Sequence, residues 1–228
     1  MVRAWLVACV LLSGCITELL AAEEVTQRST ACAVLAGHDL AWTIVIVEAG
    51  ATLPLDDAIV VLQEEVANAA GRPLATMSAR LVPGAISDVQ AWAGQVQILD
   101  GRNVRTHVLV TAAIDDLGHT MLVAGPGAFA ISADAVRDGA ARTGLPLAAV
   151  AQAVFLHGAG HVLGVVNWGI PMHGNDTAGR EEPMHHEPGD SVMSAAWHFA
   201  AGMQGNVTYD RYSDAVRADW TGAAEACA

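Results

Sequence analysis

The chain contains no lysine, so its fixed positive charge comes from arginine alone. Its 11 basic residues stand against 24 acidic ones, which gives a formal net charge of −13 at pH 7 with histidine neutral. Proteins that bind nucleic acid need positive charge to meet the phosphate backbone. The sequence therefore predicts no nucleic-acid partner.

Long apolar runs are lacking beyond the N-terminal segment. A membrane-spanning helix needs about 20 consecutive apolar residues, and no later stretch supplies them free of polar residues. At the N-terminus, Arg3 precedes the shorter apolar run Ala4–Leu12 and small residues follow it, which predicts a signal peptide over residues 1–14. We expect no polytopic membrane protein, and a chain of 228 residues favours one domain.

The signal peptide ends in Leu12-Ser13-Gly14-Cys15, which resembles the bacterial lipobox. The resemblance implies that Cys15 is lipidated and becomes the mature N-terminus; an ordinary secretory signal with a chance cysteine is the alternative. A lipid would hold the protein on a membrane surface without a transmembrane helix. We expect an exported, lipid-anchored protein of the bacterial cell envelope, with residues 15–40 as the lipidated N-terminus and tether and 41–228 as the domain.

Cysteine is scarce, with four residues in the chain. Cys9 lies in the signal peptide and Cys15 in the lipobox, which leaves Cys32 and Cys227. An exported compartment permits a disulfide bond, but two cysteines are too few to define a disulfide framework. The sequence leaves open whether Cys32 and Cys227 pair.

Hydrophobic periodicity predicts an α/β domain. A strand rich in β-branched residues opens it at 41–47, and a helix with one apolar face follows at 55–70. After residue 132 the chain becomes helical, with a long apolar helix over 147–166, and residues 167–190 are expected to be mostly loop. The further expected strands cover 75–81, 95–99, 106–113, 120–123 and 128–132, and a short final helix covers 213–224 with Ser213 as its cap.

Two histidines stand four positions apart in the long apolar helix, His157 and His161. Residues at this spacing project from the same face of a helix, where both imidazoles can reach one metal ion. The two histidines are the best candidate pair of metal ligands in the chain. Incidental histidines in a structural helix are the alternative interpretation.

The segment around this pair resembles the signature HExxHxxGxxH/D of metzincin-type zinc peptidases, with which it shares both histidines and Gly164. It is also similar to a group of predicted metallopeptidases whose active-site helix reads approximately HExGHxLGLVNxGxPM. Ten of the sixteen positions of that pattern agree over residues 157–172. The resemblance implies zinc as the cofactor, a peptide or protein as substrate or ligand, and a metzincin-like α/β (α+β) domain with a twisted mixed sheet and a long active-site helix.

A second part of the resemblance lies farther along the chain. Ser191-Val192-Met193-Ser194 is similar to the Met-turn that lies under the metal in metzincins, which gives Met193 that position. Residues 127–134 would suit the edge strand of the sheet. The resemblance is detailed over 155–194, and from about Thr106 to that segment it holds only in outline.

The position that the family gives to the catalytic glutamate is occupied by Gly158. That glutamate is the base that activates zinc-bound water, and general bases typically contribute about 10² to 10⁴ in rate. Peptide hydrolysis is therefore expected to be impaired or absent. Glu181, Glu182 and Glu187 in the following loop are alternative bases, since a base is defined by its reach to the water and not by its place in the sequence.

The third metal ligand is a second departure from the family pattern. Asn167 stands where the metzincin signature has histidine or aspartate, and a carboxamide is a poor zinc ligand. His173 is favoured instead, because the second family carries a histidine soon after its Pro-Met step, and His185 and His186 are the alternatives. The loop also lacks the cysteines that this family often carries, which predicts a less rigid loop.

Three functions remain open from the sequence. The favoured one is a noncatalytic, zinc-binding descendant of a metallopeptidase that binds peptides or protein partners at the envelope. An active zinc-dependent peptidase with another base is the second. A structural lipoprotein without metal is the third.

Overall fold

The structure is a computed structural model, and the predicted signal peptide and Cys15 lie outside the residues that it describes. The described residues are 32–33, 35–36, 39–46, 50–69, 77–83, 98–100, 103–114, 121–124, 128–165, 173–175, 181–183, 192–193, 212, 214, 217–218, 220 and 227.

A mixed β-sheet forms the largest layer of the described fold. Its strands are β1 (Asp39–Ile46), β2 (Met77–Pro83), β3 (Ile98–Asp100), β4 (Asn103–Thr111), β5 (Leu122–Ala124) and β6 (Ala128–Ser132). The strand order is β2-β1-β4-β6-β5, with β3 paired to β4 beside this path. Neighbours along β2-β1-β4-β6 are parallel, whereas β5 is antiparallel to β6 and β3 is antiparallel to β4.

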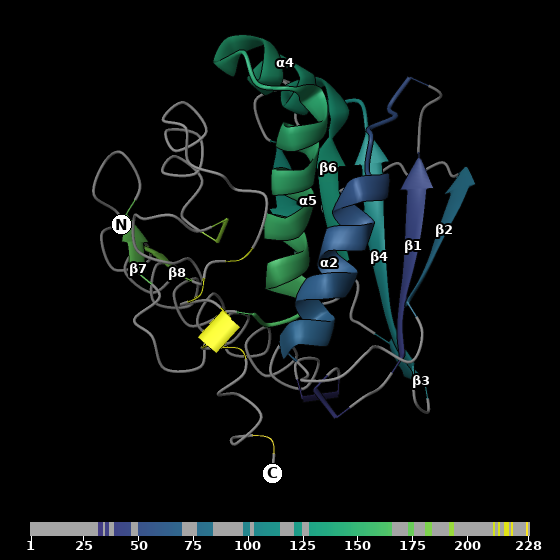
Figure 1. Ribbon diagram of the computed structural model, residues 1–228. Helices are drawn as coiled ribbons and strands as arrows, with labels where there is room; N and C mark the ends of the chain where they lie inside the picture. The colour runs from purple at the N-terminus through teal and green to yellow at the C-terminus, as the bar shows by residue number, and fades with distance from the viewer. Residues whose placement is uncertain are drawn as a thin grey trace, which may run out of the picture.

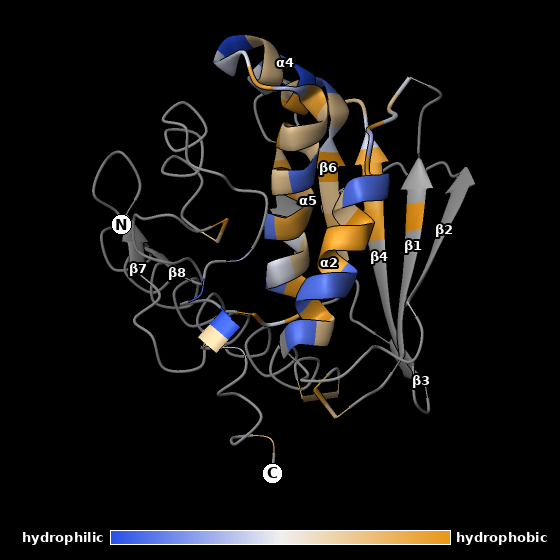
Figure 2. Cartoon of the chain, in the orientation of Figure 1, coloured by the Kyte–Doolittle hydropathy of each residue, from blue (hydrophilic) through white to orange (hydrophobic). Residues whose placement is uncertain are grey.

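Helices α2 (Asp56–Ala69), α4 (Ala133–Thr143) and α5 (Leu147–Val162) complete the core. Figure 1 shows α2 and α5 side by side on one face of the sheet, with α4 near one end of α5. Parallel neighbouring strands need a crossover connection, and α2 lies in the connection between the parallel strands β1 and β2. Figure 2 shows hydrophilic bands along α2, and this helix keeps an exposed side.

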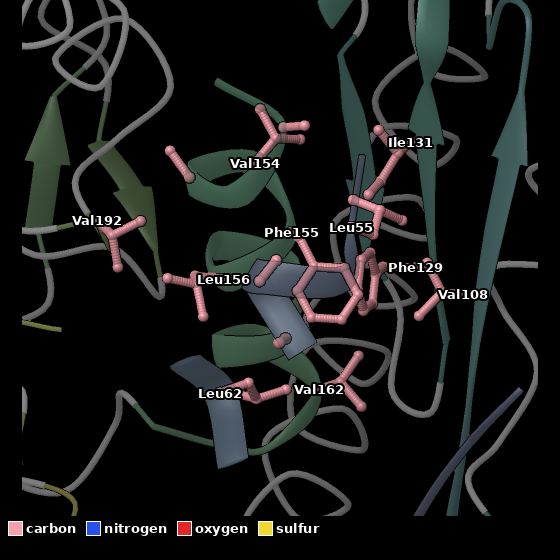
Figure 3. Packing of buried hydrophobic residues seen from close by; sticks show 14 of the residues in the cluster. Leu55, Leu62, Val108, Phe129, Ile131, Val154, Phe155, Leu156, Val162 and Val192 are labelled. Atoms are coloured by element: carbon pink, nitrogen blue, oxygen red, sulfur yellow. The ribbon is translucent and has the colours of Figure 1, made fainter. Parts of the chain in front are cut away.

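From Ala153 onward helix α5 is enclosed on all sides, because every residue from Ala153 to Val165 is buried. On the sheet side, the rings of Phe155 and Phe129 meet edge to face with their centroids 5.5 Å apart (Figure 3). Val192 lies on the opposite side of α5 from Phe129 in the same view. The helix that carries the histidine pair is therefore held between the sheet and the 192–193 segment.

The described elements confirm the mixed α/β class that periodicity predicts. Helix α4 is not predicted as a separate element, because its buried residues are mostly alanine and glycine, which give a weak apolar stripe. Its boundaries follow ordinary capping rules: the Ser132 hydroxyl accepts from the Ala135 amide at 3.2 Å, and Gly144 ends the helix in the left-handed conformation at φ 72°. The final helix is helical at the described positions 214, 217, 218 and 220, and its expected cap Ser213 lies outside the described residues.

One sequence expectation is wrong. Residues 127–134 do not supply the edge strand, because β6 lies between β4 and β5, and β5 is the strand that ends the sheet on this side. The segment 167–190, expected to be mostly loop, contains a short antiparallel pair, β7 (His173–Asn175) and β8 (Glu181–Pro183). Three-residue strands are too short for an alternating pattern to reveal them.

The two ends of the described fold are covalently joined. Cys32 and Cys227 form a disulfide with their α carbons 5.3 Å apart, which is one of the two alternatives that the sequence leaves open. Ala33 is buried and β1 begins at Asp39, so ordered structure starts within the residues assigned to the tether. Among the described residues, no helix is both long and apolar enough to span a membrane.

Candidate metal centre

The histidine pair lies on the last two turns of α5. His157 and His161 are 6% and 7% exposed, and their Nε2 atoms are 3.1 Å apart. The two rings meet edge to face with their centroids separated by 4.8 Å. The spacing of four residues thus brings both imidazoles to one point, as the sequence predicts.

A backbone carbonyl fixes the orientation of the first ring. The Nδ1 atom of His157 lies 2.6 Å from the Val192 carbonyl oxygen. A carbonyl can only accept, so this nitrogen carries the proton and the Nε2 atom of the neutral ring keeps its lone pair. A histidine that ligates a metal through one nitrogen usually donates from the other in this way.

The geometry of the pair is compatible with zinc. Two nitrogens at about 2.0–2.1 Å from Zn²⁺ in tetrahedral coordination lie about 3.3 Å apart, close to the observed 3.1 Å. Within the described residues, no three side chains of the metal-binding types come together. The pair fits two positions of a zinc site, and a third ligand must come from elsewhere in the chain.

The candidate third ligands are placed only in part. The backbone of His173 lies in β7, opposite Pro183 of β8. Asn167, His185 and His186 lie outside the described residues. Of the candidate bases, Glu181 and Glu182 belong to β8 and Glu187 lies outside the described residues.

Gly164 ends α5 directly after the histidine turn. It has φ 61°, in the left-handed region that favours glycine. The Val165 amide donates to the Gly160 carbonyl at 3.0 Å and the Gly164 amide donates to the His161 carbonyl at 3.2 Å, which is a Schellman motif. The helix therefore stops at Val162, four residues before the expected end.

The absence of a side chain at Gly160 lets the 192–193 segment pack against α5. A Cβ on Gly160 would collide with the Sδ atom of Met193, which is fully buried. Gly160 lies one residue before His161 and three after His157, so Met193 packs on the turn that separates the two histidines. The 192–193 segment thus contacts the pair through a carbonyl and supports the helix between them.

Gly158 faces the opposite way, toward the sheet. A Cβ at this position would lie 2.5 Å from Cδ2 of Phe129 and 2.9 Å from Cδ1 of Leu122. Phe129 is fully buried in β6, so its ring has little freedom to move aside. The helix approaches the sheet at this point because residue 158 is glycine.

A second group of polar contacts binds the C-terminal segment to α2. The sequence does not indicate these contacts. Arg217 donates through Nε to Oε2 of Glu65 at 2.6 Å and through Nη2 to Oε1 at 2.8 Å. The Glu65 side chain is fully buried, although an acidic residue in α2 would be expected on the solvent side. Its partner Arg217 lies 152 residues away, and no local pattern reveals that partner.

No protein-family model matches the chain, and neither a curated protein nor a solved structure matches it. The function of the pair therefore has to be inferred from the residues and their geometry.

Proposed function

We propose that the protein is a zinc-binding, metallopeptidase-like lipoprotein of the bacterial envelope in which peptide hydrolysis is impaired or absent. The observation that carries the proposal is the geometry of the histidine pair. The two Nε2 atoms converge to 3.1 Å, and the Val192 carbonyl holds the proton of His157 on the nitrogen that does not face His161. A histidine that ligates a metal usually donates its other ring N–H to a carbonyl or carboxylate in this way.

His157 and His161 would hold the metal, with His173 as the favoured third ligand and His185, His186 or Asn167 as alternatives. Zinc in such a site polarises a bound carbonyl and lowers the pKa of its water to about 7. The Val192 carbonyl keeps the first ring in the required tautomer, and the buried surroundings limit the access of bulk water. A peptide or protein segment is the proposed ligand.

The loss of hydrolysis rests on Gly158. It offers no carboxylate, and Phe129 and Leu122 occupy the space that its Cβ would enter. The family's base is thus missing, and its position is closed by core packing. We infer that the function left to this site is binding through the histidine pair, since the base is missing.

The proposal extends to the fold and to the location of the protein. A mixed sheet with an antiparallel end strand, β5, packed against the histidine helix supports a metzincin-like domain. Lipidation of Cys15 would anchor this domain to the membrane. Figure 1 shows the histidine helix α5 beside α2 on one face of the sheet.

The test measures bound zinc and casein cleavage on the same exported protein. We expect about one zinc per chain, lost on changing either histidine (His157→Ala or His161→Ala), and no cleavage that a chelator can abolish. His119→Ala is the matched control, because His119 lies outside the segment 155–194 that carries the resemblance. Chelator-sensitive cleavage by the natural chain would favour the active peptidase with another base, and a natural chain free of metal would favour the structural lipoprotein.

A further inference from the structure

Tyr212 of the C-terminal segment is bound directly to the histidine helix. The residue is 2% exposed, and its hydroxyl donates to the Leu156 carbonyl at 2.8 Å. Leu156 immediately precedes His157 in α5. The hydroxyl therefore holds the backbone of the turn from which the first imidazole projects.

The ring of Tyr212 meets the same helix at a second point. Its Cε1 atom lies 3.4 Å from the position that a Cβ on Gly160 would take, and the thioether of Met193 packs on that position too. Tyr212 and Met193 thus share the space over Gly160, and each limits where the other can lie. Met193 follows Val192, whose carbonyl accepts the proton of His157.

The segment that carries Tyr212 is itself firmly attached. Arg217 is bound to the buried carboxylate of Glu65 in α2, and Trp220 is fully buried with its ring edge to face with Tyr212, at a centroid separation of 6.4 Å. Burial and the nearby negative charge of Glu65 raise the pKa of Tyr212 well above its ordinary value of 10.0. The hydroxyl is therefore a proton donor throughout the neutral range.

We propose that Tyr212 is a positioning residue for the histidine pair. It fixes the backbone of Leu156 through its hydroxyl, so that the His157 ring on the next residue stays within hydrogen-bonding distance of the Val192 carbonyl, and its ring lies beside Met193 over Gly160. The inference rests on the proposed zinc-binding function. It assigns to the C-terminal segment a part in metal affinity that the sequence resemblance, which ends at residue 194, does not include.

The test replaces Tyr212 with phenylalanine in the exported, disulfide-bonded chain. Tyr212→Phe removes only the hydroxyl, and Tyr209→Phe is the matched control because the chain has just these two tyrosines. Two quantities are measured: the dissociation constant for zinc, and the tautomer of His157 from long-range proton–nitrogen NMR of the metal-free protein. Val66→Ala, which opens the buried core of α2, shows what a loss of stability alone does to both quantities.

We expect zinc binding roughly tenfold weaker in Tyr212→Phe, since changes in groups that orient a ligating histidine cost about 10–100-fold in affinity. The NMR signals of its His157 should show a mixture of tautomers, while Tyr209→Phe and Val66→Ala keep the natural spectrum and affinity. Natural tautomer and affinity in Tyr212→Phe, with only a lower stability, would overturn the proposal. If the natural chain binds no zinc, the proposed function fails, and the His157 tautomer still decides the role of Tyr212.

Discussion

At position 158 the histidine helix comes so near the sheet that glycine is a packing requirement. The ring of Phe129 lies where a side chain would begin, and it is fully buried. A glutamate introduced alone would direct its carboxylate at apolar core atoms, and burying an unpaired carboxylate is costly. Introducing the glutamate of the zinc peptidases that the segment resembles is therefore not expected to produce their chemistry. The sequence marks the glycine as unusual, but only the structure gives its packing partner.

We predict that Gly158→Ala lowers the free energy of unfolding, because overpacking a core costs about 1–3 kcal/mol. The gain in helix propensity, up to about 1 kcal/mol, offsets part of this cost, so the expected net loss is up to about 2 kcal/mol. Urea unfolding followed by circular dichroism measures the change. Gly139→Ala in α4 is the control, because the close contact of its Cβ would be with the flexible end of Met121, and Val150 would lie at an ordinary 4.0 Å. Equal losses in the two variants would contradict the interpretation.

At the level of elements, the sequence predicts what depends on local pattern. Strand β1 and helix α2 lie within two residues of their predicted bounds, because a β-branched run and an apolar stripe are strong signals. The end of α5 is predicted four residues late, since the apolar run continues past Val162 while the backbone turns at Gly164. The pairing order of the strands has no such local signal, which is why the edge strand is misassigned.

We predict that Gly164→Ala destabilises the protein by about 1–2 kcal/mol, because a left-handed conformation costs this much for a residue with a Cβ. Zinc affinity should fall with it, since the affected turn follows His161 directly. Gly50→Ala is the control, because a Cβ there has nothing within 4 Å and Gly50 is not among the positive-φ glycines. Thermal unfolding compares the two variants, and an equal midpoint would count against the Schellman motif.

At the level of the whole molecule, the C-terminal segment is held by contacts that join distant parts of the chain. Glu65 pairs with Arg217, Tyr212 binds Leu156, and Cys32 is bonded to Cys227. Neither of the two noncovalent contacts can be predicted from the sequence, because each depends on how the complete fold brings distant segments together. The histidine pair could be predicted from spacing alone, but not the segment that supports it.

Alkaline pH should weaken this attachment. Because the pKa of Tyr212 is raised in the folded state, folding favours the protonated hydroxyl, so its contribution is complete below the unfolded pKa of about 10 and declines as the pH rises above it. We predict a fall in the free energy of unfolding above pH 10 that is smaller in Tyr212→Phe. Tyr209→Phe should retain the fall, and an unchanged pH profile in Tyr212→Phe would show that another group causes it.

Reduction of the disulfide should cost about 2–5 kcal/mol of stability, since the bond closes a very long loop. The unfolding midpoint in denaturant, with and without a reducing agent, measures this loss. Cys227→Ser should reproduce the reduced value and be insensitive to the agent. A natural chain whose midpoint does not change on reduction would show that the bond contributes nothing.

The bond between Cys32 and Cys227 also makes a covalent ring of the whole fold between them. A single proteolytic cut anywhere inside the ring leaves both pieces attached to each other. The fragments would separate only after reduction, so a nicked chain would migrate intact on a non-reducing gel. If Cys15 is lipidated as proposed, both fragments of a domain that is cut once would therefore stay attached to the membrane anchor.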